Sequence, residues 1–532
     1  MLKLNLSSGL VSSYSKNYSL VLISIITLLT SACGTNPVTK KREFQLVSES
    51  QEISIGQKNY APARQSQGGD YVLDPELTAY VQGIGNKLAA VSDRKLPYEF
   101  TILNDSIPNA WAMPGGKIAF NRGLLYELNS EAELAAVMGH EMVHAAARHG
   151  AKGMERGIFM QGAMVAVGLA SKDSNYANLI VGGAQLSAQL ATSKYGRDAE
   201  SESDLYGMQY MKKAGYDPTA AVALQETFVR LSADKKSNFI EGLFASHPPS
   251  PERVAANKIT LAQIGAGGEW GKEIYAQKVT KLKSTQTAYK AYDEGVKALA
   301  AKDMEKATML AKQAIAGEPR EARFQELLGD IALSQKNSAV ALTYYDKAIQ
   351  MQPDYFKPHV QGGIALFNMG RKAEAEKYLA QGNRLLPTAP SHFLLGKIAE
   401  ERGDMTNALS HYEVAAASNS DIGKQSLAGY MRLDLPQHPA KYLQAGLQVG
   451  DNGHLYVTVQ NPTSLAVGRV QVKVLQYDAN TGLAVWQSPP LTMTSGIASN
   501  QRGYVAVGGV SIKKQQELKF YKAVIVGAEL AQ

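Results

Sequence analysis

Four segments in the second half of the chain repeat one pattern of small residues and prolines at a step of 33 or 34 residues. Three residue types keep this step at once: Gly295, Gly329, Gly363 and Gly396; Ala307, Ala341, Ala375 and Ala408; and Pro319, Pro353 and Pro387. Small residues let paired helices pack closely, and a proline ends the second helix of each pair. Because such a unit buries its apolar face only against its neighbours, this region is predicted to form an α-helical solenoid.

The period, and the order of glycine, alanine, large residue and proline, are those of the tetratricopeptide repeat (TPR). We predict about four TPR units over residues 288–422. A solenoid of this kind has a concave face that suits a bound segment of a partner protein. The repeat sequence does not identify that partner.

Residues 130–150 predict a single helix, because a serine followed three residues later by a glutamate forms a capping box before apolar residues at helical spacing. Within it, His140 and His144 are four residues apart and project from one face, where both imidazoles can reach one Zn²⁺. Glu141 lies about 100° round the helix from His140 and can contact a metal-bound water without being a ligand. This spacing predicts a metallopeptidase helix with Glu141 as general base, although two core histidines are the structural alternative.

A third metal ligand is expected in the acidic stretch that follows Tyr195, because a catalytic zinc takes three protein ligands and keeps one open position. Glu200 and Asp204 are four residues apart and share a helix face. Glu200 can complete a His-His-Glu set, and Asp204 can hold the outer nitrogen of a ligand histidine. Glu202 is the rival ligand, but it lies off the face of Asp204. A solvated acidic helix face is the alternative for the pair.

A strand before the metal helix is the candidate for substrate binding. Alternating residues predict strands at 98–103, 110–113 and 117–121, with a Pro-Gly-Gly turn between the last two. An exposed strand edge can hold an extended peptide by main-chain hydrogen bonds, and an ordinary hairpin in the sheet is the alternative. The candidate substrate-binding residues are Asn109, Ala110, Trp111 and Ala112.

Two apolar, glycine-containing segments follow the metal helix, at residues 157–170 and 178–191. Each is too short to cross a bilayer as a helix, so we expect core helices. Their glycines leave a mobile lid as the alternative.

Residues 1–32 are predicted to be a signal peptide, because two lysines precede an apolar run at 19–29 that is too short to span a membrane. Small residues then lead to Cys33, the only cysteine of the chain, which cannot form an intrachain disulfide. The segment resembles a bacterial lipobox, so Cys33 is the expected lipidation site and Gly34 favours sorting to the outer membrane. Cleavage by an ordinary signal peptidase is the alternative. Residues 35–41 are expected to form a tether.

Composition supports several domains without a nucleic-acid partner. The chain has 532 residues and a net charge of +7, a mild surplus that indicates solubility and does not argue for nucleic acid. Residues 33–265 hold the predicted metallopeptidase domain, and 266–287 are expected to be a linker. Short alternating segments with turns at regular spacing predict a β-sandwich accessory domain at 437–532.

Three motifs together carry a specific resemblance. They are N-A-W-A-M-P-G-G from Asn109, H-E-M-V-H-x-x-x-R-H from His140 to His149, and Y-G-R-D-A-E-S-E-S-D from Tyr195. With residues 36–255 as a whole, they resemble the zinc peptidase family that includes the CAAX prenyl proteases. Within that family, the combination with TPR units is similar to a BepA-like periplasmic branch.

The resemblance implies that His140, His144 and Glu200 bind one Zn²⁺ and that Glu141 is the base. Zinc would polarise the scissile carbonyl while Glu141 takes a proton from water and passes it to the leaving amine. The expected fold class is multidomain and mainly α. It comprises an α+β zincin-like metallopeptidase domain, an α-helical TPR solenoid and a C-terminal β-sandwich.

Two more residues receive roles by the same resemblance. His247, in the motif S-H-P-P, is expected to approach the metal and to hold the enzyme latent. His247 and Arg253 could equally stabilise the developing oxyanion, and a proline-rich loop with a capping histidine is the structural alternative.

The resemblance implies an endopeptidase of the periplasm, anchored to the outer membrane, that acts on protein substrates. The expected substrates are misfolded or stalled outer-membrane proteins, and the TPR domain is expected to dock their assembly machinery. A chaperone or scaffold with a latent peptidase is the alternative function. The presence of His140, Glu141, His144 and Glu200 argues against an enzyme that has lost its catalytic residues.

Overall fold

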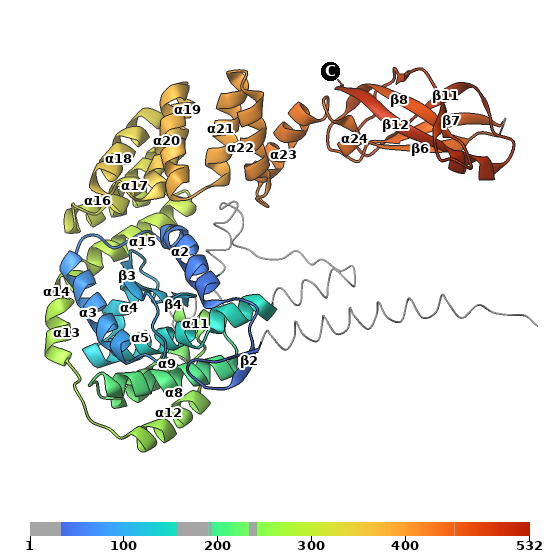
Figure 1. Cartoon of the computed structure of the whole chain (residues 1–532). Helices are drawn as coiled ribbons and strands as arrows, with labels where there is room; N and C mark the ends of the chain where they lie inside the picture. Colours follow the sequence, from blue (N-terminus) through green and yellow to red (C-terminus); the bar gives the residue numbers. More distant parts are fainter. Residues whose placement is uncertain (1–32, 157–189, 191–193, 234–241, 452, 532) are drawn as a thin grey trace, which may run out of the picture. The chain divides into compact units, whose positions relative to one another are not determined.

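The computed structural model describes residues 33–156, 190, 194–233, 242–451 and 453–531 (Figure 1). The predicted signal peptide lies outside these residues, as do the two predicted apolar helices apart from Leu190. The chain divides into two compact units, the first ending at Gln361 and the second beginning at Gly362. Within the described ranges, no helix is both long enough and apolar enough to cross a bilayer.

The first unit contains a three-stranded sheet in the order β3-β5-β4, formed by β3 (Glu99–Leu103), β4 (Ala110–Met113) and β5 (Lys117–Asn121). β3 pairs with β5 in parallel and β4 pairs with β5 antiparallel, so β4 is an edge strand. Gly115 and Gly116 turn the chain between β4 and β5 at φ values of 79° and 83°, a backbone region that favours glycine.

Helix α5 (Glu131–Ala146) packs between this sheet and the helices α8 (Arg197–Lys213) and α9 (Thr219–Ala233) (Figure 1). Its first turn is capped by Ser130, whose Oγ accepts a hydrogen bond from Glu133 N at 3.1 Å. A Cβ atom on Gly139 would lie 3.0 Å from the backbone of α8, so the glycine lets the two helices approach closely. This approach brings the histidine face of α5 against the acidic face of α8.

The remaining elements of the peptidase region surround this core. They are β1 (Cys33–Thr35), β2 (Arg42–Phe44), α2 (Glu49–Ser66), α3 (Pro75–Val91), α4 (Arg122–Glu127), α11 (Leu243–Ser246), α12 (Pro251–Ile264), α13 (Lys272–Lys278) and α14 (Thr280–Ser284).

Two segments that were expected to be loose connections are packed against the peptidase core. Residues 35–41 are not a free tether, because Asn36 is fully buried and its Nδ2 donates to Ala147 O at 3.0 Å. Residues 266–287, expected to be a linker, contain α13 and α14, and Tyr275 is buried with its hydroxyl donating to Leu125 O at 2.8 Å. Both contacts join residues more than 100 positions apart in the chain.

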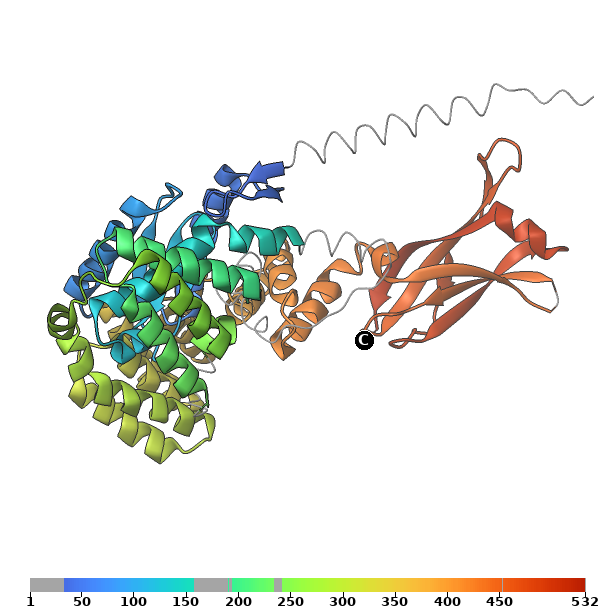
Figure 2. The same cartoon turned by 90° about the horizontal axis from the view of Figure 1, so that it is seen from below.

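Helix pairs follow from residue 286, as the period predicted, and the helices α15 to α18 of the first unit lie side by side (Figure 2). A Cβ atom on Gly329 would lie 2.5 Å from the ring of Tyr345, and one on Gly363 would lie 2.6 Å from Leu379. These two glycines therefore make room for a large residue of the paired helix. The helices are α15 (Gln286–Ala300), α16 (Met304–Gly317), α17 (Ala322–Ser334), α18 (Ser338–Met351), α19 (Phe356–Asn368), α20 (Lys372–Leu385), α21 (Ala389–Glu401), α22 (Met405–Ala416), α23 (Asp421–Asp434) and α24 (Pro439–Tyr442).

A buried polar network joins the first repeat to the peptidase sheet within the first unit. Asn104, directly after β3, donates through Nδ2 to Glu321 Oε2 at 3.0 Å, and the hydroxyl of Tyr289 on α15 donates to the same carboxylate. Arg122 is fully buried, donates to Asn104 Oδ1 at 2.8 Å, and lies 3.3 Å from the centre of the Tyr289 ring. The first repeat is therefore part of the structure that supports the loop between β3 and β4.

We expect the substitution Glu321→Ala to lower the free energy of unfolding by about 2–4 kcal/mol, because it leaves buried donors of Asn104 and Tyr289 without their acceptor. Urea-induced unfolding measures the change. The matched control is Glu305→Ala on the exposed side of α16, which should leave the unfolding midpoint unchanged. Equal midpoints for the two variants would contradict the assignment of this network as a structural junction.

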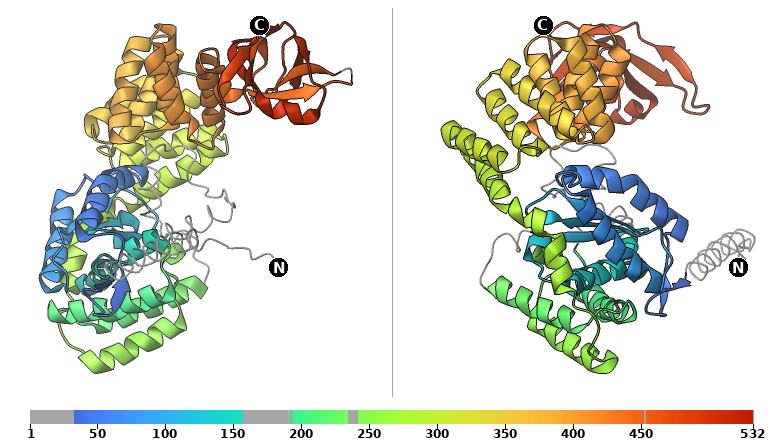
Figure 3. Two further views of the ribbon diagram at one scale, coloured as in Figure 1. Left: turned by 45° about the vertical axis from the view of Figure 1, so that its right-hand side comes forward. Right: turned by 90° about the vertical axis from the view of Figure 1, so that its left-hand side faces the viewer.

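The C-terminal part of the second unit contains two antiparallel sheets (Figure 3). One has the order β10-β8-β12 with β9 also paired to β8, and the other has the order β11-β7-β6. Val457 and Val459 from β7 and Val470, Val472 and Val474 from β8 join one buried apolar cluster, as their alternation along each strand predicts. The strands are β6 (Gln444–Val449), β7 (His454–Gln460), β8 (Val467–Tyr477), β9 (Ala484–Gln487), β10 (Leu491–Met493), β11 (Arg502–Ser511) and β12 (Tyr521–Leu530).

Candidate metal centre

Four side chains converge on one point between α5, α8 and the residue after α11. His140, His144, Glu200 and His247 each offer a ligand atom, and these atoms all lie within 4.8 Å of one another. The two Nε2 atoms of His140 and His144 are 3.0 Å apart, and the Glu200 carboxylate lies 3.5 Å from each of them. The structure thus brings the three predicted ligands together, although α5 and α8 are separated by 50 residues.

Asp204 and Arg253 contact two of the predicted ligands, His140 and Glu200, and fix their orientation. Asp204 Oδ1 lies 2.9 Å from His140 Nδ1, so it fixes the ring nitrogen that faces away from the cluster. Arg253 donates through Nε and Nη2 to Asp204 at 2.8 and 2.7 Å, and its Nη1 lies 3.0 Å from Glu200 Oε2. Burial acts to raise the pKa of Asp204, but the hydrogen bonds from Arg253 and His140 outweigh it and hold the pKa below its ordinary value.

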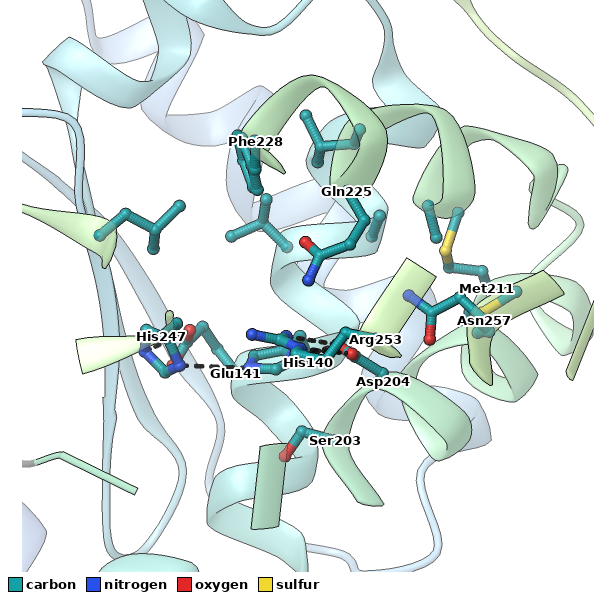
Figure 4. Close-up of a pocket in the computed structure, with 16 residues that line it drawn as sticks. His140, Glu141, Ser203, Asp204, Met211, Gln225, Phe228, His247, Arg253 and Asn257 are labelled. Carbon is teal, nitrogen blue, oxygen red and sulfur yellow. Dashed lines mark hydrogen bonds and ion pairs between the residues drawn. The ribbon is translucent and has the colours of Figure 1, made fainter. Parts of the chain in front are cut away.

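Glu141 is buried beside the cluster, and neither of its carboxylate oxygens accepts a hydrogen bond from the described residues. Its Oε1 lies 3.4 Å from His247 Nε2, and Figure 4 shows these two side chains next to each other. Burial raises the pKa of the Glu141 carboxyl above its ordinary value. A carboxylate with free acceptor atoms and a raised pKa is suited to take a proton from water.

His247 is a fourth donor at the cluster. Its Nδ1 lies 3.0 Å from Glu200 Oε1 and 3.3 Å from His140 Nε2, and its ring is buried. Figure 4 shows it on the opposite side of His140 from Arg253. The side chain therefore lies against two of the three predicted ligands.

Two residues in the quoted motifs received no role from the sequence. The ring of Tyr195 stacks on that of His144, with centroids 3.8 Å apart, and its hydroxyl donates to Ala112 O of β4 at 3.4 Å. His149 Nδ1 lies 3.0 Å from His144 Nδ1, and its Nε2 lies 3.2 Å from Glu202. Glu202, the rival ligand, thus lies at His149 and outside the cluster. Only the place of His149 at the end of the histidine-rich motif could have indicated this contact.

The predicted substrate residues lie at the loop before β4 and along this edge strand. Ala110, Trp111 and Ala112 are all buried, and Asn109 O accepts a hydrogen bond from Asn121 N of β5 at 2.8 Å. The Trp111 ring packs with Tyr60 on α2, at a centroid distance of 5.8 Å. The strand edge therefore reaches the metal cluster through Tyr195.

A pocket of about 60 Å³ with both polar and apolar walls adjoins His140 and Glu141 (Figure 4). Its apolar walls include Leu224 and Phe228 from α9 and Leu243 from α11. This volume has room for a few water molecules or for a small apolar side chain.

The donor set fits zinc. Two imidazoles and one carboxylate are the ligands of many catalytic zinc sites, and a further position is left for water. Burial lowers the pKa of His144 well below its ordinary value, so its ring is neutral and its Nε2 is free to bind a metal. His144, His140 and Glu200 would hold the ion.

We expect the substitution Asp204→Asn to weaken zinc binding by about 10- to 100-fold, because His140 loses the carboxylate that fixes its orientation. Competition against a fluorescent zinc chelator measures the affinity. The control Asp198→Asn lies on the same helix, exposed to solvent, and should bind zinc as the unchanged protein does. Equal affinity in the Asp204 variant would show that Asp204 does not support His140.

The helix with two histidines, the distant glutamate and the buried base define a metallopeptidase of the H-E-x-x-H type. Residues 75–259 match the model of peptidase family M48, and residues 292–356 and 360–422 match the tetratricopeptide repeat. The chain therefore carries an M48 peptidase domain followed by TPR units. The chain is a zinc metalloendopeptidase, and residues 75–259 are the part that is similar to family M48.

Three relatives show how far this similarity extends. The chain is 26% identical to the β-barrel assembly-enhancing protease of Yersinia pestis over 449 residues, which cover 74% of this chain and 89% of that protein. It is 33% identical to a putative β-barrel assembly-enhancing protease of Vibrio cholerae, over 37% of this chain and 40% of that protein. It is 34% identical to the mitochondrial metalloendopeptidase OMA1 of Schizosaccharomyces pombe, over 41% and 63% of the two chains.

Proposed function

We propose that the protein is a zinc-dependent endopeptidase of the periplasm, held at the outer membrane by a lipid on Cys33, that degrades misfolded or stalled outer-membrane proteins. The convergence of His140, His144 and Glu200 on one point carries the enzymatic part of this proposal. The relatives named for β-barrel assembly support the choice of substrates. The predicted lipobox supports the location.

The proposed domains are a signal peptide at 1–32, a zincin-like peptidase domain at 33–265, a connecting segment at 266–287, TPR units at 288–422 and a β-sandwich at 437–532. The two antiparallel sheets with a common apolar cluster support the last assignment. The helical pairs support the TPR boundaries, and the concave side of such repeats is the proposed docking site for the assembly machinery.

The proposed chemistry is hydrolysis of a peptide bond. Zinc held by His140, His144 and Glu200 would supply a Lewis acid that polarises the carbonyl and lowers the pKa of water. Glu141 takes the proton of the attacking water and passes it to the leaving amine, since both of its oxygens are free to accept.

Arg253 and Asp204 are proposed as positioning residues. The guanidinium of Arg253 is engaged with the carboxylates of Asp204 and Glu200, so it fixes the ligands and is not free to face an oxyanion. This assignment replaces the expectation that Arg253 stabilises the developing charge.

The substrate is proposed to bind as an extended strand beside β4, at Asn109, Ala110, Trp111 and Ala112. The position of β4 at the edge of the sheet supports this binding mode. The apolar wall of the pocket beside Glu141 would then contact a small side chain of the substrate.

A latent enzyme with a scaffold function is the second candidate, and the position of His247 favours it. His247 contacts Glu200, His140 and Glu141 at once, so substrate can enter only after this side chain has moved. In this candidate the TPR units would act while the peptidase is closed.

A cellular comparison separates the two functions. Glu141→Gln should cause defective outer-membrane proteins to accumulate to the level seen when the gene is removed, if peptide cleavage is the function. Deletion of residues 288–422 tests the TPR units in parallel. Full function in the Glu141 variant, with loss in the deletion, would establish the scaffold and overturn the proteolytic role.

A further inference from the structure

The hairpin that begins at Cys33 is fixed to the end of the metal helix. Asn36 is fully buried, and its Nδ2 donates to Ala147 O, directly after α5, at 3.0 Å. Its Oδ1 accepts hydrogen bonds from Val38 N and Thr39 N at 2.9 and 3.0 Å, which closes the turn. Three residues of extended chain span at most about 10 Å. Any group attached at Cys33 is therefore joined to the peptidase domain by a very short segment of chain.

Two large apolar side chains are exposed after this turn, Phe44 at the end of β2 and Leu46 just beyond it. Phe44 and Leu46 are 41% and 46% exposed. Glu43, which precedes Phe44, accepts hydrogen bonds from Asn36 and from Lys152 Nζ, the latter at 2.7 Å. A strand at the surface of a soluble protein ordinarily does the reverse, burying its large apolar side chains. The exposed face is thus suited to an apolar partner.

Basic residues flank these apolar side chains. Lys40, Lys41 and Arg42 are consecutive and exposed, and the side chains of the two lysines are 68% and 73% exposed. The acidic groups that face the lysines are Asp93, 3.9 Å from Lys40 Nζ, and Glu202, 3.5 Å from Lys41 Nζ. Ion pairs this long and this exposed are weak. The lysines therefore remain available to negatively charged groups.

We propose that Lys40, Arg42, Phe44 and Leu46 form a membrane-contact face that seats the peptidase domain on an anionic phospholipid surface. Apolar side chains that enter the headgroup region, flanked by lysine and arginine, are the chemistry that such a surface recognises. Backbone pairing places Phe44 opposite Cys33 in the hairpin. The proposed attachment residue and Phe44 are therefore paired residues of one hairpin.

The contact also sets the orientation of the enzyme. Because Asn36 links the same hairpin to the end of α5, the metal helix has a fixed direction relative to the bilayer once the face is seated. The inference rests on the proposed lipidation only for the anchor, since the contact face itself needs no acyl group.

Vesicle binding without the acyl group tests the face. The chain from residue 33 onward, with Cys33→Ser, is sedimented with phosphatidylcholine vesicles that contain or lack phosphatidylglycerol. We expect the parent protein to bind the anionic vesicles. The double variant Phe44→Ser, Leu46→Ser should bind them with an affinity lower by about tenfold or more. The double variant Lys40→Gln, Arg42→Gln should lose about tenfold on anionic vesicles only.

A matched control removes two exposed apolar residues elsewhere in the first unit. Ile259 and Ile274 are 62% and 45% exposed, and the variant Ile259→Ser, Ile274→Ser should bind vesicles as the parent does. Circular dichroism and thermal unfolding establish that each variant is folded. The proposal would be overturned if the parent protein did not bind anionic vesicles. It would also be overturned if the variant Phe44→Ser, Leu46→Ser bound them as tightly as the control. Vesicle binding by a protein that cleaves no peptide would reject the proposed enzyme function alone.

Discussion

The variant Glu141→Gln should lose cleavage of a peptide substrate by about 10²- to 10⁴-fold in kcat while it keeps its bound zinc. Glutamine retains the shape of the side chain but cannot take a proton, and proton transfer by a positioned side chain contributes an effect of this size. Glu141 has no hydrogen-bond partner among the described residues that the substitution would disturb. Cleavage of a fluorogenic peptide, with zinc content measured on the same sample, tests the prediction.

The control for this variant is Glu226→Gln, which changes the same group on the surface of α9. Among the described residues, Glu226 forms an exposed ion pair with Lys258, so the loss of its charge should leave kcat unchanged. If Glu141→Gln lowered the zinc content together with the activity, its effect would not be that of a base.

The variant Glu200→Ala should lose zinc, with an affinity more than about 100-fold lower than that of the unchanged protein. The loss of a group that only orients a ligand costs about 10- to 100-fold, and the loss of a ligand itself should exceed this range. The carboxylate lies 3.5 Å from Nε2 of both His140 and His144, so the substitution removes the carboxylate that faces both histidines.

Glu202→Ala is the matched control because it lies two residues further along the same helix. Its carboxylate contacts His149 Nε2 at 3.2 Å, outside the cluster of ligand atoms. Zinc affinity should remain within a few-fold of the parent. A result in which Glu202→Ala releases the metal and Glu200→Ala retains it would reverse the assignment of the third ligand.

The parts of the fold that could be predicted are those that repeat or are local. The TPR helices follow from a period kept by Gly329 and Gly363, and the structure supplies the reason, since each glycine makes room for a large side chain of the paired helix. The projection of His140 and His144 from one helix face follows from their spacing of four residues. A contact of Asp204 with one of the ligand histidines was expected from helix spacing, and the structure places Asp204 Oδ1 2.9 Å from His140 Nδ1.

The remaining contacts leave no periodic signal, because they join residues that are distant in the chain. Asn36 bonds to Ala147, and Tyr275 bonds to Leu125, so segments expected to be loose are parts of the core. Tyr195 could be found only as a neighbour of the acidic motif, and its stacking on His144 depends on how α8 meets α5. Arg122, which is charged but fully buried, would have been placed on the surface by composition.

Metal analysis of the purified protein tests the central claim most directly. Inductively coupled plasma mass spectrometry should find one zinc per chain in the unchanged protein and none in a variant that combines His144→Ala with Glu200→Ala. The zinc-containing sample should cleave casein, and a chelator should stop this cleavage until zinc is restored. A correctly folded parent without zinc, which takes up none and cleaves nothing when zinc is added, would contradict the account.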